Sequence, residues 1–211
     1  MLLGLQAYHD ATRGTHRERA VARAEQAVSA MFEEERAWSY VAALYVLLFT
    51  DRLDEGIRFV DTTLADVRKR GAVFNFSGMA MTRAIFGYAR GTLVEAEADA
   101  RMGLEALPHR GVLFTSHTYG WLAQVLVERG AVDEAADVLR EVEDALGGIP
   151  DEFAHVPLLR ARALVSAARG DHRAALADTL ATGRVSARSG MRTRPCRIQA
   201  GARRPRWRIT R

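Results

Sequence analysis

Histidine is the side chain most often found in metal sites and in acid–base catalysis, and this chain has six histidines. They are His9, His16, His109, His117, His155 and His172. No two of them have the spacing of a metal-binding pattern such as H-E-x-x-H, so neither a metal nor another cofactor is predicted. His117, Thr118 and Tyr119 open a predicted helix and could line a groove. Their favoured interpretation is as core or rim residues.

Paired carboxylates are a second kind of candidate, because two acids in one site can divide general acid and general base roles. Asp133 with Glu134 and Glu141 with Asp144 are such pairs. They fall in first turns and on exposed faces of predicted helices, where acidic side chains favour the helix dipole and solubility. Neither a G-x-S-x-G nucleophile pattern nor a G-x-x-x-x-G-K-[ST] phosphate loop occurs. We therefore predict that the chain is not an enzyme and assign no catalytic residue.

Four aromatic side chains, Phe74, Phe76, Phe86 and Tyr88, lie at mixed helical spacing in one stretch. We predict that they belong mainly to the core. The alternative is a pocket on a concave face for a peptide or small effector, because the inner helices of helical arrays often line the binding surface.

A repeat indicates the elements that must position these side chains. Four segments read alike: D-R-L-D-E-G-I (51–57), G-T-L-V-E-A-E (91–97), G-A-V-D-E-A-A (130–136) and G-D-H-R-A-A-L (170–176). In each, a small residue (Gly56, Ala96, Ala135 or Ala175) follows the turn residue by five positions, at spacings of 40, 39 and 40. A fixed period in this range is typical of stacked helical hairpins, which bind partners more often than they catalyse reactions.

Apolar residues recur at helical spacing between these turns. The predicted helices are residues 1–12, 16–31, 33–49, 53–70, 73–90, 92–107, 113–129, 132–146, 151–169 and 172–187. Pro150 is well placed to start the fifth hairpin. Close helix contacts need small residues, and the candidates are Ala84 with Ala96, Ala123 with Ala135 and Ala163 with Ala175. The prediction is an all-α, right-handed superhelical array of about five antiparallel hairpins over residues 1–190.

The third repeat resembles the tetratricopeptide pattern. With Gly91 as the turn glycine, Ala84, Ala96, Ala100, Leu104 and Pro108 fall at the expected positions. The fourth and fifth repeats keep part of the pattern, whereas the first full repeat has Asp51 and Gly56 in place of Gly and Ala. The period of 39–40 exceeds the standard 34, so HEAT-like packing stays an alternative, although the R-G turns favour tetratricopeptide-like hairpins.

A more specific resemblance covers most of residues 36–195. The phrases R-G-T-L-V-E-A-E-A-D-A-R, W-L-A-Q-V-L-V-E-R-G-A-V-D-E-A and R-A-L-V-S-A-A-R-G-D-H-R-A-A-L-A-D carry it. They resemble the helical-repeat region of large ATP-binding LuxR-type transcriptional regulators of actinobacteria. Such regulators combine a P-loop ATPase, a helical-repeat sensor and a helix-turn-helix. Because this chain has neither the phosphate loop nor a convincing helix-turn-helix, the resemblance implies only the sensor segment and carries over no catalytic residue.

The net charge of +4 hides two unlike parts. Residues 182–211 hold ten of the 30 basic residues and no acidic one, which leaves 20 basic against 26 acidic residues, or −6, in residues 1–181. Residues 191–211 are predicted to form a basic, disordered tail. The alternatives are a nucleic-acid-binding arm in which Trp207 stacks on a base, or an out-of-frame translation that replaced a DNA-binding domain.

The remaining features indicate a cytoplasmic protein. The start lacks a signal peptide, Cys196 is the only cysteine, and the longest apolar run, residues 40–49, is about half the roughly 20 residues that span a bilayer. The expected partner is a protein or small effector on the concave face, with self-association possible, nucleic acid bound only weakly through the tail, and no membrane. The rival functions are a free-standing scaffold and a nucleic-acid-binding protein.

Overall fold

The protein is built from helices alone in the part of the chain that its computed structural model describes, which is residues 2–29, 37–106, 112–150 and 152–189. Its helices are α1 (Leu2–Thr12), α2 (Arg17–Ser29), α3 (Ala37–Phe49), α4 (Leu53–Lys69), α5 (Val73–Arg90), α6 (Leu93–Ala106), α7 (Val112–Glu128), α8 (Val132–Leu146), α9 (Val156–Ala168) and α10 (His172–Arg188). A short 3-10 turn, η2 (Phe153–His155), precedes α9. The prediction of an all-α array of five hairpins is confirmed.

The hairpin turns have one geometry, repeated along the chain. After α3, α5, α7 and α9 the turn residue is Asp51, Gly91, Gly130 or Gly170, and each has a positive φ between 62° and 88°. In each turn the next residue donates its backbone N–H to a carbonyl five residues earlier, as Thr92 does to Gly87 at 3.0 Å. This arrangement satisfies carbonyls at the helix end and explains the preference for glycine. Asp51 adopts the same conformation without being glycine, so the repeat is structurally intact there.

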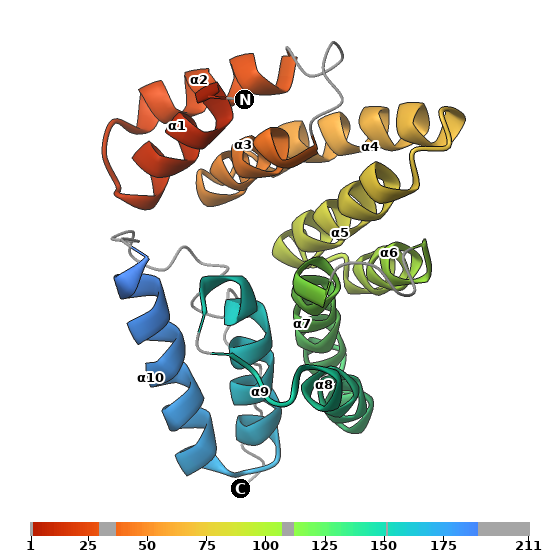
Figure 1. Ribbon diagram of the computed structural model, residues 1–211, viewed down its shortest axis with the longest axis vertical. Helices are drawn as coiled ribbons and strands as arrows, with labels where there is room; N and C mark the ends of the chain where they lie inside the picture. Colours follow the sequence, from red (N-terminus) through yellow and green to blue (C-terminus); the bar gives the residue numbers. More distant parts are fainter. Residues whose placement is uncertain (1, 30–36, 107–111, 151, 190–211) are drawn as a thin grey trace, which may run out of the picture.

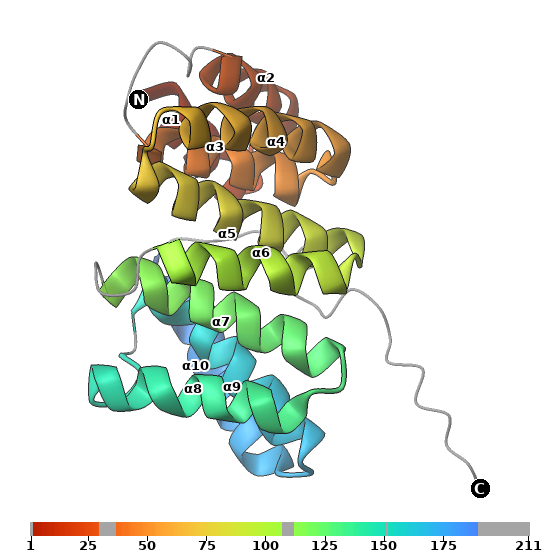
Figure 2. The same cartoon turned by 90° about the vertical axis from the view of Figure 1, so that its right-hand side faces the viewer.

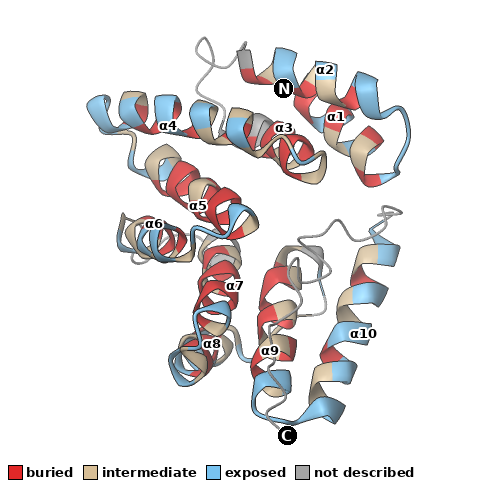
Figure 3. Ribbon diagram, turned by 180° about the vertical axis from the view of Figure 1, so that it is seen from behind, coloured by how far each residue is buried: buried red, intermediate tan, exposed pale blue. Residues whose placement is uncertain are grey.

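The helices form a curved array in which α3 and α5 lie nearer the inner side than α4 and α6 (Figure 1). We call α1, α3, α5, α7 and α9 the A helices and α2, α4, α6, α8 and α10 the B helices. Figure 2 shows the hairpins stacked in chain order. In Figure 3 the A helices α5 and α7 are largely buried, whereas α10 presents exposed surface along its length. The two helices of a hairpin do not always pack mainly on each other, since α4 packs more extensively against α5 than against its hairpin partner α3.

Some predicted boundaries differ from the structure. Helix α9 begins at Val156 rather than at residue 151, and Pro157, not Pro150, lies in its first turn. Proline suits this position because its missing N–H would have no partner within the helix. Residues 30–36, 107–111 and 190–211, which include Pro108, His109 and the arginine-rich tail, lie outside the described residues, so the predictions for them stay predictions.

The buried core forms two clusters, one mainly in α1–α5 and the other mainly in α7–α9, and many of its members are small residues. Ala84, Ala96, Ala123 and Ala135 are fully buried, as the predicted close contacts require. A methyl group added to Gly87 would lie 3.1 Å from the Ala96 side chain, so Gly87 brings α5 close to α6 at this point. The Ser77 hydroxyl donates to the Gly103 carbonyl at 2.6 Å and joins the same two helices at their other end. Ala175 of the last hairpin is only partly buried.

Two hairpins each contain an arginine–aspartate ion pair, and the two pairs stand at equivalent positions of the repeat. Arg83 binds both carboxylate oxygens of Asp99 at 2.8 and 2.5 Å, and Arg162 binds those of Asp178 at 2.8 and 2.7 Å. Each arginine stands eight residues before its turn glycine and each aspartate eight residues after it. Each arginine also reaches the B helix of the preceding hairpin, Arg83 at Asp61 (3.2 Å) and Arg162 at Glu143 (2.6 Å). These arginines therefore fasten neighbouring hairpins together.

We expect Arg162→Ala to lower the free energy of unfolding by about 1–2 kcal/mol, because the mostly buried Asp178 carboxylate would lose its bidentate partner. The matched control is Arg140→Ala, which removes an arginine paired with Asp137 in a well-exposed i,i+3 contact and should change stability by about 0.5 kcal/mol or less. Chemical denaturation of the two variants measures the difference. Equal losses would show that the Arg162 pair contributes no more than a surface contact.

Candidate functional site

A group of aromatic side chains joins the A helices across the inner side of the array. It consists of Tyr8 of α1, Tyr45 and Phe49 of α3, Tyr88 of α5, His117 and Trp121 of α7, and Arg160 of α9. We call it the inner aromatic cluster. Because Tyr45 reaches His117 past the intervening helix α5, the contact can form only on the side where the A helices converge.

The rings of the inner aromatic cluster meet edge to face or tilted. The Tyr45 ring centroid lies 6.3 Å from that of Tyr8 and 5.7 Å from that of Phe49, and Tyr88 meets Trp121 at 5.6 Å. The Arg160 guanidinium carbon lies 6.0 Å from the Trp121 ring centroid, which places a cation at the indole face. These geometries suit the positive edges and negative faces of aromatic rings.

His117 is the polar centre of the cluster. Its Nε2 lies 2.7 Å from the Tyr45 hydroxyl and accepts a second hydrogen bond from the Trp121 indole N–H at 3.3 Å. Its Nδ1 lies 3.4 Å from the Ala154 carbonyl in η2. Two donors on Nε2 assign the proton to Nδ1, which then donates to Ala154. The imidazole thus connects α3, α7 and η2.

Burial makes the uncharged forms of these groups the stable ones. It lowers the pKa of His117 to about 4 and raises the pKa values of Tyr8 and Tyr88 to about 12. It also raises the pKa of Tyr45, with a further increase from Tyr8. At neutral pH the cluster therefore carries hydroxyl, imidazole and indole groups without charge, next to the Arg160 cation.

We expect the stability of the protein to fall below pH 6.5 because of His117. The unfolded chain protonates a histidine near pH 6.5 and the folded protein only near pH 4, so the stabilisation is complete above about 6.5 and is lost as the pH falls toward 4. The loss attributable to this residue should reach about 2 kcal/mol by pH 5. Urea unfolding of wild type and His117→Gln at pH 7.5 and 5.0 measures it as a smaller pH effect in the variant.

The control for this measurement is His172→Gln, which changes an exposed histidine and should keep the wild-type pH dependence. His155 adds an effect of the same sign, since burial lowers its pKa too, and both variants retain it. If His117→Gln kept the full pH dependence, the depressed pKa of His117 would be contradicted.

The other histidines are scattered through the described structure. His9, His16 and His172 are exposed, and His155 is buried, with no hydrogen-bond partner for its Nδ1 among the described residues. Among those residues no cluster of three or more histidine, cysteine or acidic side chains could hold a metal ion. Thr118 is buried, and the Tyr119 hydroxyl donates to Glu141 at 3.2 Å, so only His117 of that trio belongs to the cluster.

The members of each predicted carboxylate pair do not share a partner. Asp133 binds Arg169 at 2.7 Å, whereas its neighbour Glu134 binds Arg101 at 2.5 Å. Glu141 accepts from Tyr119 on another helix, and Asp144 is exposed. The Asp133 and Glu134 contacts join neighbouring hairpins, whereas the Glu141 contact lies within the α7–α8 hairpin.

The aromatic stretch of α5 divides between two environments. Phe86 is fully buried and Tyr88 nearly so, in agreement with a core position, and Tyr88 also belongs to the inner aromatic cluster. Phe74 is 41% exposed, and the Phe76 ring lies 5.8 Å from the Arg68 guanidinium. Sequence reasoning missed Tyr8, Tyr45, Phe49, Trp121 and Arg160 as a group. One signal was present, because Tyr8 and Tyr45 stand six residues before their turn residues, Gly14 and Asp51.

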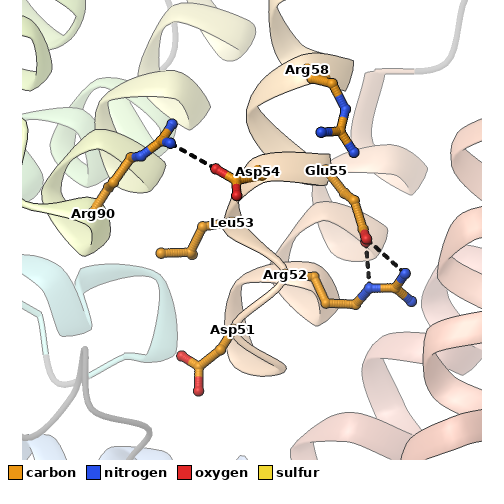
Figure 4. A pocket seen from close by; sticks show the side chains of 7 residues that line it. All are labelled: Asp51, Arg52, Leu53, Asp54, Glu55, Arg58 and Arg90. Atoms are coloured by element: carbon orange, nitrogen blue, oxygen red, sulfur yellow. Dashed lines mark hydrogen bonds and ion pairs between the residues drawn. The ribbon is translucent and has the colours of Figure 1, made fainter.

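A hollow of about 530 Å³ lies at the turn between α3 and α4 (Figure 4). Its lining residues are Asp51, Arg52, Leu53, Asp54, Glu55, Arg58 and Arg90. The charges already neutralise one another, since Arg90 pairs with Asp54 at 2.8 Å and Arg52 pairs with Glu55 and with Glu25 of α2. A ligand would have to break these pairs, which makes the hollow a weaker candidate than the inner aromatic cluster.

The inner aromatic cluster is suited to recognition. Aromatic faces and edges bind apolar side chains. Aromatic side chains and arginine are also the residue types that most often dominate binding energy at protein interfaces. None of the helices in the described ranges combines the length and apolar character needed to cross a membrane.

Solved structures resemble this chain in fold. A kinesin light chain-like protein of Podosopora anserina with nearly identical TPR-like repeats matches with a TM-score of 0.61 and 16% identity, over 90% of this chain and 96% of that chain. A second structure of such a protein, with one substitution, matches with a TM-score of 0.62 and 15% identity over 89% and 94% of the two chains. No family model matches the chain, and no curated protein matches it. The fold is thus a tetratricopeptide-like helical repeat.

Proposed function

We propose that this chain is a non-catalytic protein-interaction module that binds a partner protein on the inner side of its array. The carrying observation is the inner aromatic cluster, which draws side chains from all five A helices. A binding surface assembled from successive repeats is the usual use of such arrays. Within the cluster, Tyr8, Tyr45, Phe49 and His117 have intermediate exposure, whereas Tyr88 and Trp121 are buried.

The chemistry of the cluster favours a segment with apolar side chains. The rings of Tyr8, Tyr45 and Phe49, which have intermediate exposure, provide apolar contact area. Binding would need little further ordering of these side chains, because the rings are already held by one another.

The more specific proposal is that the chain is the sensor segment of a LuxR-type ATP-dependent transcriptional regulator, acting in the cytoplasm. The repeat phrases around Gly91, Gly130 and Gly170 support it. In this role a partner or effector on the inner face would favour one of two states of a larger assembly. A free-standing scaffold is the second candidate, and the tetratricopeptide-like fold supports both equally.

Site-specific photocrosslinking tests the interaction surface. A benzophenone-bearing phenylalanine analogue replaces Phe49 in the inner aromatic cluster, and the control replaces Val94, which is 63% exposed on the B helix α6. Irradiation of cells producing the two variants should give a discrete protein adduct at position 49 and not at 94. The same adducts at both positions, or none at position 49, would contradict binding at the inner face.

The regulator proposal has a separate test in the DNA around the gene. Translation of about two kilobases on each side in all frames should show a P-loop ATPase upstream and a helix-turn-helix downstream. Unrelated neighbouring genes would leave the free-standing scaffold as the supported function.

A further inference from the structure

Helix α10 carries an apolar stripe on its exposed side. Leu176 and Leu180 are 60% and 54% exposed and stand one turn apart. Ala177 and Ala187 are exposed along the same side, and a methyl group added to Gly183 would meet nothing within 4 Å. Figure 3 shows exposed surface along α10, whose principal contact is with α9. We call Leu176, Ala177, Leu180, Gly183 and Ala187 the α10 stripe.

The repeat register shows which direction the stripe faces. Leu176 and Leu180 stand six and ten residues after the turn glycine Gly170. At the same positions the earlier B helices contact the hairpin that follows them. Asp61 of α4 pairs with Arg83, Glu97 of α6 pairs with Arg129, and Arg101 of α6 pairs with Glu134. The α9–α10 hairpin keeps this geometry, because its Arg162–Asp178 pair has the register of Arg83–Asp99.

The α10 end of the array exposes apolar residues, whereas a terminal repeat that faces solvent is expected to expose polar ones. Terminal repeats normally present a polar outer face, whereas α10 has leucines at positions where α6 has Glu97 and Arg101. At the other end of the array, Gln6 and His9 of α1 are exposed and polar at the positions equivalent to Arg83 and Phe86. Leu5 of α1 is 49% exposed as well, whereas α10 exposes two leucines that stand one turn apart.

We propose that α10 pairs with α10 of a second copy of this chain, antiparallel and centred on Leu180. A twofold interface must be complementary to itself. In this register Leu180 meets Leu180 of the partner subunit on the axis, and Ala177 lies opposite Gly183 of the partner subunit. The small pair lets the helices approach closely on either side of the leucines.

The charges of α10 agree with this register. Arg173 and Arg184 flank the stripe and are exposed. In the antiparallel pair Arg173 lies opposite Ala187 of the partner subunit, and Arg184 lies opposite Leu176 of the partner subunit. No arginine faces an arginine, whereas a parallel pair would place Arg173 and Arg184 each against its own copy. The residues of the inner aromatic cluster lie on other helices than α10, so this pairing does not depend on the proposed function.

Sedimentation equilibrium of the full chain tests the pairing. Wild type should be a dimer at micromolar concentration, and Leu180→Glu should be a monomer, because it places two carboxylates on the twofold axis. The control Val94→Glu changes an equally exposed apolar residue on α6 and should stay dimeric. Circular dichroism checks that each variant is folded. A monomeric wild type, or a dimer that persists in Leu180→Glu, would overturn the proposal.

Disulfide trapping tests the register directly. In a Cys196→Ser background, Leu180→Cys should form a covalent dimer on mild oxidation, since a residue on the twofold axis lies next to its own copy. Val94→Cys in the same background should stay monomeric under denaturing conditions. Equal trapping at both positions would show random collision and contradict the register.

Discussion

Gly120→Ala is expected to destabilise the protein by about 3 kcal/mol or more, because α7 and α9 touch at this glycine through their backbones. A methyl group on Gly120 would lie 2.6 Å from both the Leu158 nitrogen and the Pro157 carbonyl carbon. No side-chain rotation can relieve this overlap, so the helices must separate. Separation would also break the hydrogen bond from the Gln124 amide to the Pro157 carbonyl, 3.2 Å long and fully buried.

The matched control is Gly183→Ala, which changes another glycine inside a helix at a position open to solvent. In dilute solution this variant should gain about 0.5–1 kcal/mol, since alanine favours the helix and nothing obstructs its methyl group. Guanidinium unfolding followed by circular dichroism measures both variants. If Gly120→Ala proved neutral, the close approach of α7 and α9 would be contradicted.

The contrast between these two glycines shows what a single sequence could indicate. The hairpins were predictable, because turn residues and small residues recur at fixed spacing and each hairpin closes through local contacts. Gly120 and Gly183 look alike in sequence, and only the packing of α7 on α9 makes one of them essential. That packing depends on how the hairpins rotate relative to one another, which no local pattern encodes.

The inner aromatic cluster was hidden for the same reason. Tyr45 and His117 are 72 residues apart and come together because the A helices converge on the inner side of the array. The sequence placed each on a helix but gave no sign that the two helices, which are not consecutive A helices, would meet. The sequence contains the leucines of α10, but the direction in which they face could be inferred only from the ion pairs at equivalent positions of the earlier hairpins.

Phe86→Ala is expected to cost about 3–5 kcal/mol, because Phe86 is the largest fully buried side chain of the described core. Its ring occupies the space where a side chain at Gly56 would stand, so a methyl group there would overlap the ring. This explains why the first full repeat has glycine where the later repeats have alanine. At this position the first full repeat has glycine, which is smaller than alanine, and the Phe86 ring of the next A helix fills the space.

A double-mutant cycle isolates this fit. Gly56→Ala alone should cost about 1–3 kcal/mol through overlap with the ring. In the Phe86→Ala background the same change should be neutral or should stabilise by up to about 1 kcal/mol, because the ring is gone and alanine favours the helix. Gly183→Ala, which is distant, should instead add its effect independently in both backgrounds. Equal costs of Gly56→Ala with and without the ring would mean that α4 and α5 do not meet as described. A coupling of about 2 kcal/mol would place the α4–α5 contact at this glycine and ring, where the array joins its second hairpin to its third.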